Sequence, residues 1–170
     1  VSDTVIGEAA GPNEIEVTGA GIRVRGTSRD VTITGNTVTG GDDGIDVGAG
    51  ADGVSVADNV VRRSGDALTL GGDGVIATGN VLSENVRAIV SSGESVEIEG
   101  NRIGLAATDS EVLGNSGDGV TVTGGDALVI GNTIAGSALD GVKVIGGEAT
   151  LRGNRIYDTD GTPILTATGP

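Results

Sequence analysis

Acidic side chains recur at one position of a repeated pattern, and they are the first candidates for chemistry in this chain. The residues that precede five short apolar runs are, in chain order, Asp43, Asp66, Arg87, Asp118 and Asp140. If these positions stack, carboxylates about 5 Å apart repel one another unless they are solvated, paired or bridged by a cation. We expect solvated aspartates in which Arg87 neutralises Asp66 below it and Asp118 above it. A stripe of bound cations is the alternative.

The densest group of acids in the chain is Asp42, Asp43 and Asp46, within the segment GGDDGIDV. Carboxylate oxygens are the ligands that Ca²⁺ prefers, but a tight site needs six or more of them. No cluster in this chain supplies that number. The sequence therefore predicts no cofactor, with Ca²⁺ at these three aspartates as the one alternative.

Several residue types that carry chemistry are absent. The chain has no His, Cys, Met, Phe or Trp, and Tyr157 is its one aromatic residue. This composition excludes disulfides, His or Cys metal sites, and His or Cys catalysis. Lys143, the one lysine, has Thr121 and Leu165 as its expected neighbours, so it lacks the acid-bound cation that a lyase base requires. We predict no catalytic residues and no enzyme activity.

The net charge limits the partners of this chain. Among 170 residues, 24 acids stand against 10 bases, which gives −14. Such a surface repels phosphate backbones and anionic lipids, and the chain lacks aromatic platforms for single strands. No apolar run approaches the roughly 18 residues of a membrane span. We expect neither nucleic-acid binding nor membrane insertion.

The elements that position these side chains follow a repeat of about 22 residues. One recurring unit is an alternating β-branched run that ends in Asn, at Asn36, Asn59, Asn80, Asn101, Asn132 and Asn154. The successive spacings are 23, 21, 21, 31 and 22 residues. A second ladder of short apolar runs keeps the same spacing and lengthens in the same unit. The extra residues therefore form one inserted loop within 104–118.

Each repeat contains two or three short segments of period two, and none shows helical periodicity. Such strands bury no face alone, but stacked coils do. The predicted fold is all-β, a right-handed parallel β-helix (β-solenoid) of about seven coils. We predict a single domain over 1–170, with 1–20 as the N-terminal edge coil and 163–170 as the C-terminal edge. A narrow interior filled by Val, Ile and Leu explains the missing Phe and Trp.

The alternation within each run also predicts which polar residues point into the core and which aliphatic residues point out of it. We expect the six asparagines to point inward at bends, to tolerate left-handed geometry and to stack their amides. Outward aliphatic residues are also predicted, among them Ile76, Leu128, Val60 and Val81. We expect the 104–118 loop to cover them, with contact to another chain as the alternative.

The GNxI/V corners at this spacing resemble the parallel β-helix repeat of the pectin-lyase-like superfamily. The stretch NRIGLAATDSEVLGNSGDGVTV (101–122) is similar to a unit of large secreted bacterial and archaeal β-helix proteins, although Leu105 and Ala106 replace its Thr-Asp pair. The resemblance implies the fold. It does not choose among functions, because that superfamily spans lyases, hydrolases, epimerases, adhesins and structural rods.

The leading functional hypothesis is a non-catalytic structural or interaction module, located outside the cell or on its surface. The expected partners are copies of itself stacked end to end, or neighbouring segments of a longer surface protein. This expectation rests on the absence of an amphipathic capping helix at 1–20 or 163–170. The alternatives are a polysaccharide-active fragment of lyase, hydrolase or epimerase type, and a carbohydrate-binding adhesin module.

Overall fold

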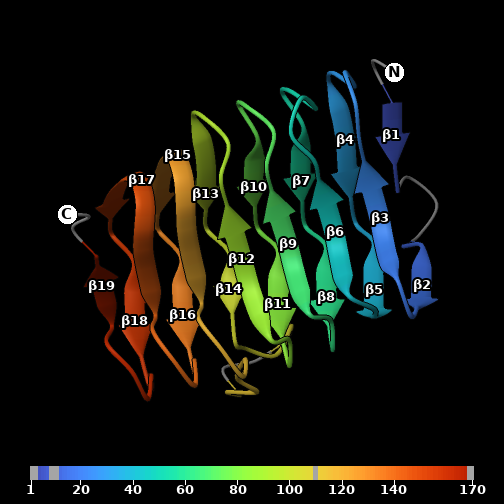
Figure 1. Cartoon of the computed structure of the whole chain (residues 1–170). Helices are drawn as coiled ribbons and strands as arrows, with labels where there is room; N and C mark the ends of the chain where they lie inside the picture. The colour runs from blue at the N-terminus through green and yellow to red at the C-terminus, as the bar shows by residue number, and fades with distance from the viewer. Residues whose placement is uncertain (1–3, 8–11, 109–110, 168–170) are drawn as a thin grey trace.

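The computed structural model describes residues 4–7, 12–108 and 111–167. The described part contains strands and no helix, so no helix in it could cross a membrane. The strands stack as a parallel β-solenoid of seven coils, which runs from the N-terminus to the C-terminus across Figure 1. This architecture confirms the predicted all-β parallel β-helix.

Each coil has three faces, numbered here in the order in which the chain visits them. Face 1 holds β1 (Thr4–Ile6), β4 (Val31–Thr34), β7 (Ser55–Ala57), β10 (Ile76–Thr78) and β13 (Val96–Glu99). Face 2 holds β2 (Glu14–Val17), β5 (Thr37–Gly40), β8 (Val60–Arg62), β11 (Val81–Ser83), β14 (Arg102–Ile103), β16 (Thr133–Ala135) and β18 (Arg155–Tyr157). Face 3 holds β3 (Ala20–Val24), β6 (Asp43–Val47), β9 (Asp66–Leu70), β12 (Arg87–Ser91) and β19 (Ile164–Thr166). The long strands β15 (Val120–Ile130) and β17 (Val142–Arg152) run from face 3 into face 1.

Every strand pairs in parallel with its equivalent in the next coil. On face 3, for example, Ile45 pairs with Leu68, and Leu68 pairs with Ile89. This register places equivalent residues of successive coils directly above one another. Each position of the repeat therefore forms a column of side chains, spaced about 4.8 Å apart along the solenoid axis. Side chains far apart in sequence therefore become neighbours.

The core is a stack of medium-sized aliphatic side chains, as the parity of the runs predicts. Its largest fully buried members are Ile33, Ile45, Leu68, Leu70, Leu82, Ile89, Ile98, Ile103, Ile134, Val38, Val47 and Val54. Three predicted inward residues in the last described coil depart from this pattern. Leu151 and Ile156 are partly buried, and Ile164 on β19 is 49% exposed. No described coil packs over them from the other side.

The bend between face 1 and face 2 corrects one expectation about the asparagines. The left-handed residue is the one before each asparagine: Gly35, Asp58, Gly79, Gly100, Gly131 and Gly153, with φ of 65°, 55°, 65°, 61°, 64° and 62°. None of the six asparagines has positive φ. Glycine reaches this region without steric cost and a short Asp tolerates it, which explains the Gly or Asp before each Asn.

The inserted loop lies where the spacing predicts, at the lower edge of the molecule in Figure 1. It folds back on itself through an antiparallel bridge between Leu105 and Val112, and Leu105 is buried. The loop lines a cavity with Val60 and Val81 on face 2, so it covers two of the predicted outward aliphatics. It leaves Ile76 on face 1 42% exposed, against the expectation. The physical reason is that the loop leaves the coil from β14, so its short tether keeps it on face 2.

Candidate functional site: the charged rows of face 3

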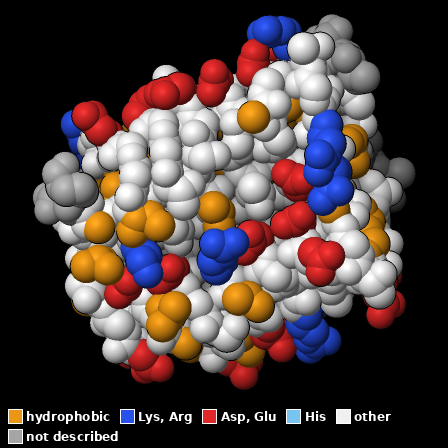
Figure 2. Space-filling view, in the orientation of Figure 1, with side chains coloured by type: hydrophobic (Ala, Val, Ile, Leu, Met, Phe, Trp, Pro, Cys, Tyr) orange, Lys and Arg blue, Asp and Glu red, His pale blue; other side chains and the backbone are white. Residues whose placement is uncertain are grey.

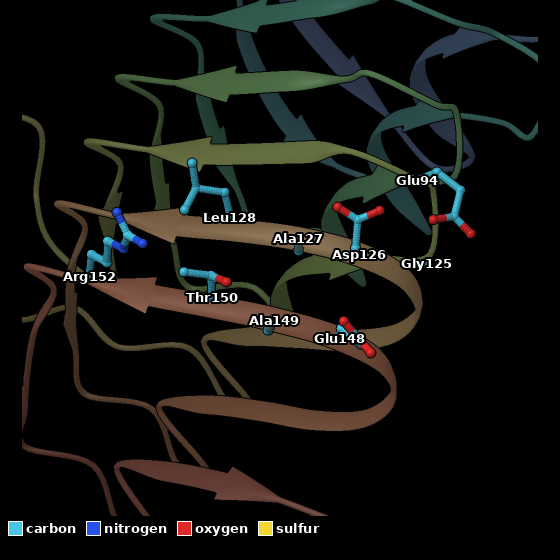
Figure 3. A pocket seen from close by; sticks show the side chains of 9 residues that line it. All are labelled: Glu94, Gly125, Asp126, Ala127, Leu128, Glu148, Ala149, Thr150 and Arg152. Atoms are coloured by element: carbon cyan, nitrogen blue, oxygen red, sulfur yellow. The ribbon is translucent and has the colours of Figure 1, made fainter.

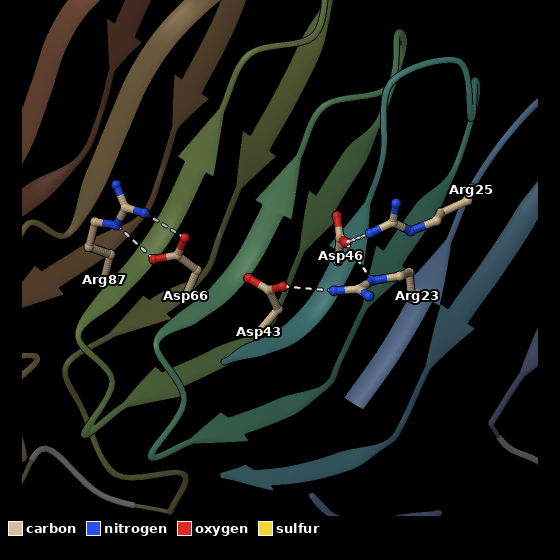
Figure 4. Close-up of polar contacts among 6 residues, drawn as sticks. All are labelled: Arg23, Arg25, Asp43, Asp46, Asp66 and Arg87. Carbon is tan, nitrogen blue, oxygen red and sulfur yellow. Dashed lines mark hydrogen bonds and ion pairs between the residues drawn. The ribbon is translucent and has the colours of Figure 1, made fainter. Parts of the chain in front are cut away.

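The first charged cluster of face 3 joins β3 to β6. Arg23 donates through Nε to Asp46 Oδ2 at 2.7 Å and through Nη2 to Asp43 Oδ2 at 3.1 Å. Arg25 Nη2 reaches the same Asp46 oxygen at 3.5 Å. Figure 4 shows Arg23 on β3 and Arg25 just after the end of β3 converging on these aspartates. Both carboxylates are therefore neutralised by guanidinium groups from the coil below.

The second cluster is the pair between Arg87 and Asp66, one coil apart. Arg87 donates through Nε and Nη2 to the two Asp66 oxygens at 2.7 and 2.6 Å, a two-pronged contact (Figure 4). The hydrogen bond to Asp66 raises the pKa of Arg87, and Asp118 and Asp43 raise it further through their charges. The structure thus brings Arg87 to Asp66 as predicted, whereas Asp118 has a different direct partner.

The third cluster is formed by Lys143, which is the direct partner of Asp118. Its Nζ lies 3.5 Å from Asp118 Oδ2 and 3.6 Å from Asp140 Oδ2. Thr121 Oγ1 also donates to Asp118 Oδ2 at 3.3 Å. The repeat spacing predicts only the residues directly below and above Lys143, which are Thr121 and Leu165. The two acids lie in the adjacent column, which the long lysine side chain reaches diagonally.

The two buried aspartates of this cluster, Asp118 and Asp140, also accept hydrogen bonds from backbone N–H groups of the next coil. Asp118 Oδ1 accepts from the backbone N–H of Asp140 at 2.9 Å, and Asp140 Oδ1 accepts from the backbone N–H of Thr162 at 2.8 Å. Each carboxylate therefore uses one oxygen to tie its coil to the next and the other to face Lys143. Figure 2 shows such acidic and basic side chains side by side on the surface that carries β3, β6, β9 and β12.

The three aspartates predicted as Ca²⁺ ligands occupy different surroundings. Asp43 and Asp46 lie in ion pairs with Arg23, while Asp42 is exposed on the preceding turn. Across residues 4–7, 12–108 and 111–167 there is no group of three or more acids that could hold a metal ion. A cation at this position would have to displace a guanidinium group, and the Ca²⁺ site stays a prediction.

The structure places the six asparagines of the repeat in one continuous ladder at the bend between faces 1 and 2. In the central coil, Asn80 donates through its backbone N–H and Nδ2 to Asn101 Oδ1, both at 2.9 Å. Asn80 Nδ2 also donates to the carbonyl of Val56 at 2.8 Å. The same contacts repeat from Asn36 to Asn132, and Asn13 extends the ladder by donating to Asn36 Oδ1 at 2.8 Å.

A second ladder, which sequence reasoning missed, lies at the bend between faces 2 and 3. Its members are Ser64, Asn85, Asn115 and Ser137. The backbone N–H of Ser64 donates to Asn85 Oδ1, and that of Asn85 donates to Asn115 Oδ1, both at 3.0 Å. The signal was present in the spacing, because Ser64, Asn85 and Asn115 are separated by 21 and 30 residues, including the same long interval.

A row of acids at the bend between faces 3 and 1 is also absent from the sequence predictions. It comprises Asp73, Glu94, Asp126 and Glu148, and we call it the acidic corner. Three of its members line a cavity of about 660 Å³ on face 1 (Figure 3). A hydrogen bond to Asp126 raises the pKa of Glu94, with further contributions from desolvation and from the charges of Asp126 and Asp73. No member takes part in an ion pair of the described chain.

Comparison with known proteins agrees with this architecture. Residues 18–169 match the model of the family described as periplasmic copper-binding protein (NosD). Among solved structures, an alginate lyase from Paenibacillus sp. str. FPU-7 is 17% identical, covers 98% of this chain and 87% of its own, and has a TM-score of 0.39. No curated protein matches the chain. The family match confirms the predicted relationship to pectin-lyase-like β-helix proteins, and the chain belongs to the NosD family.

Proposed function

We propose that the chain is a non-catalytic structural or interaction module, with residues 1–170 as one β-solenoid. The observation that carries this proposal is the pairing on face 3. Arg23, Arg25, Arg87 and Lys143 each lie against an aspartate of the same face. These pairs hold adjacent coils together, and among the described residues of face 3 they leave no free base beside a group of acids that could hold a cation.

The protonation state of Arg87 supports the same proposal. A general base must lose its proton near the working pH, so its pKa has to fall toward neutrality. Asp66 shifts the pKa of Arg87 in the opposite direction. We expect the protein to release no unsaturated product from alginate or pectate, with or without Ca²⁺. Sustained product formation that is lost in Arg87→Gln would contradict the non-catalytic assignment.

The description of the family raises the question of copper. Copper sites in proteins rely on imidazole, thiolate and thioether ligands. This chain has no His, Cys or Met, and its described residues contain no group of three acids that could hold a metal. The donor set of this chain therefore does not fit copper, and we assign it no role in copper binding.

The proposed partners are a second copy of the chain or a neighbouring segment of a longer protein, stacked on the solenoid's axis. The support comes from the outermost described strands. β19 pairs with β17 alone, and Ile164 on it is 49% exposed. A strand with one free edge and an uncovered apolar residue is a template for another strand.

Light scattering and negative-stain microscopy test self-stacking. We expect the average mass to rise with concentration and short rods to form. Ile164→Lys should prevent this growth. Leu139→Lys serves as the matched control, because Leu139 is similarly exposed at 51% but lies on a corner rather than on the end coil. A monodisperse monomer at high concentration would reject self-stacking and leave attachment to a longer chain.

We further propose an exported location, in the periplasm or at the cell surface. The support is the periplasmic description of the family. Fractionation of the native cells with an antibody against the solenoid tests this location. Recovery in the cytoplasmic fraction alone would contradict it.

A further inference from the structure

The cavity between the inserted loop and face 2 contains two buried polar groups that no group of the described chain satisfies. It has a volume of about 440 Å³ and is lined on one side by β5, β8 and β11 and on the other by the loop. Ser83 is 1% exposed and lines this cavity, yet its Oγ has no hydrogen-bond partner. Arg62 Nε is equally buried and unpartnered. A buried polar group without a partner is costly to folding, so native proteins rarely keep two of them side by side.

Arg62 and Ser83 line the same cavity from neighbouring coils. They are paired neighbours in the register of β8 and β11, so their side chains project from adjacent coils on the outer surface of face 2. Arg62 takes part in none of the ion pairs of the described chain, unlike its sequence neighbour Arg63, which pairs with Glu84 at 3.3 Å. A planar guanidinium beside a hydroxyl donor suits an oxyanion, above all a carboxylate.

The walls of the cavity add a second requirement. Val60, Val81 and Leu113 supply aliphatic surface, and Ala106 and Ala107 add small apolar groups. A volume of about 440 Å³ falls within the range of small-molecule sites and exceeds what an inorganic ion fills. The ligand should therefore carry an apolar skeleton as well as an anionic group.

Neighbouring acids decide on which side of Arg62 the ligand lies. The groove on the other side of Arg62 is lined by Glu14 and Glu16, which would repel an anion. Among the described residues that line the loop side, Glu111 is the one carboxylate, and it is exposed and already has an interaction of its own. The described lining of the loop side therefore carries fewer carboxylates than that of the groove.

From this arrangement we propose that the cavity under the inserted loop binds a small organic carboxylate. Its carboxylate accepts from Arg62 and Ser83, and its aliphatic part packs against Val60, Val81 and Leu113. This site is separate from the charged rows of face 3, so it does not depend on the proposed structural role.

Titration of the full chain with butyrate, followed by ¹H–¹⁵N NMR at constant ionic strength, tests the proposal. We expect a saturable shift of the Arg62 Nε–H signal and of the Ser83 amide, together with a rise in melting temperature. Inorganic phosphate serves as the second probe, and we expect it to bind at least about tenfold more weakly because it cannot use the apolar wall. Phosphate binding as tight as that of butyrate would overturn the organic part of the assignment.

Variants separate this site from general anion binding. Arg62→Gln should weaken butyrate binding at least about tenfold, and Ser83→Ala should weaken it a few-fold. Arg152→Gln is the matched control, because Arg152 is also outside every ion pair but lies on face 1. If Arg62→Gln lowers the melting temperature, Arg62→Lys serves as a milder variant. It keeps the positive charge but loses the paired N–H donors of the guanidinium, so it should also weaken butyrate binding. Absence of saturation, or equal losses in Arg62→Gln and Arg152→Gln, would overturn the site.

Discussion

A buried asparagine amide has two donor hydrogens and one acceptor oxygen, and the ladder uses all of them. Asn59 Nδ2 lies 2.9 Å from the carbonyl oxygens of Ile33 and Ala57 and 3.0 Å from Asn80 Oδ1, so its two hydrogens serve three acceptors and one hydrogen is shared. Its own oxygen accepts from the backbone N–H of Asn36 at 3.0 Å. Each amide therefore satisfies backbone groups that the bend removes from the strand ladders, and it links three coils.

The first prediction compares the middle of this ladder with its last described member. Asn80→Ala removes the contacts of the side chain to Val56 and Asn101 and leaves the backbone N–H of Asn59 without its acceptor. A buried polar group without a partner costs about 1–3 kcal/mol, and we expect Asn80→Ala to lower the free energy of unfolding by an amount near the upper value. Asn154→Ala should cost less, because Asn154 is only part-buried and loses fewer contacts. Urea unfolding measures both, and equal, negligible losses would refute the buried ladder.

The second prediction concerns Glu94 in the acidic corner. Its pKa is raised above the ordinary 4.5, chiefly by the hydrogen bond to Asp126, so the folded chain binds this proton more tightly than the unfolded chain. The resulting stabilisation is fully present below the ordinary pKa and is lost as the pH rises through the raised value. Glu94→Gln mimics the protonated form and should raise the melting temperature at pH 7 with little effect in acid.

Glu99→Gln is the control for this measurement. It also removes a single negative charge, from Glu99 at the end of β13 on face 1, five residues after Glu94. We expect a smaller rise at pH 7 for Glu99→Gln. Identical rises in the two variants would show that net charge alone is responsible, and would contradict a specific contact between Glu94 and Asp126.

At the scale of the strands, the start of each face 3 strand explains the small residue of the repeat. The chain turns inward there, so a side chain at this position meets the next coil. A Cβ added to Gly119 would lie 2.5 Å from the carbonyl oxygen of Gly141 and 2.6 Å from Ile134 Cγ2. Ala67 and Ala88 occupy the same position in the third and fourth coils and are fully buried. Where another described coil covers it, the position therefore accepts a methyl group at most, and in some coils not even that; the larger Pro163 occupies it only in the last described coil.

The third prediction uses this difference. Gly119→Ala should destabilise the fold by about 1–3 kcal/mol, the usual range for overpacking a dense interior. Gly19→Ala is the matched control, because nothing lies within 4 Å of its added Cβ and its φ is not positive. Reduced chain entropy should make that variant neutral or slightly more stable. Urea unfolding of the two variants measures the contrast, and a neutral Gly119→Ala would show that the strand start can shift.

The strands themselves were largely predictable, because parity within a run and spacing between runs are local properties of the sequence. Ile33, Leu68 and Ile98 are fully buried as their positions in the runs predict. The direction of the inserted loop was not predictable, since it depends on which face the chain leaves. The contacts of Lys143 were missed for a related reason: they run diagonally between columns, and spacing alone aligns residues only within a column.

At the scale of the whole molecule, the repulsion between stacked acids falls at the acidic corner and not along face 3, where the sequence predicts it. The repeat spacing predicts that repulsion between stacked carboxylates falls on Asp43, Asp66, Asp118 and Asp140. Each of these lies within an ion pair of face 3. The acidic corner is a stacked row of acids without such partners, in which Asp73, Glu94 and Asp126 contact adjacent coils through backbone N–H groups or one another. Stacking builds this repulsion, because the repeat puts an acid at the same corner in successive coils.

The fourth prediction is that salt stabilises the fold. The net charge of −14 means that unpaired acids outnumber the ion pairs that salt would weaken. Screening lengths fall from about 30 Å at 0.01 M to about 3 Å at 1 M salt, which is below the spacing of the coils. We therefore expect the melting temperature to rise with NaCl. A melting temperature that stays flat or falls across this range would contradict the argument.

A comparison with CaCl₂ at matched ionic strength separates this general effect from a bound ion. A specific site would raise the melting temperature at millimolar Ca²⁺, where equal ionic strength from NaCl does little. We expect only a weak additional effect, because Asp43 and Asp46 already hold Arg23 at 3.1 and 2.7 Å, and a single carboxylate, Asp42, remains outside these pairs. Asp42→Asn should then leave the CaCl₂ series unchanged. A large Ca²⁺ shift that disappears in Asp42→Asn would instead contradict the expected absence of a cofactor and would support the alternative, in which the ion displaces Arg23 and is held by Asp42, Asp43 and Asp46.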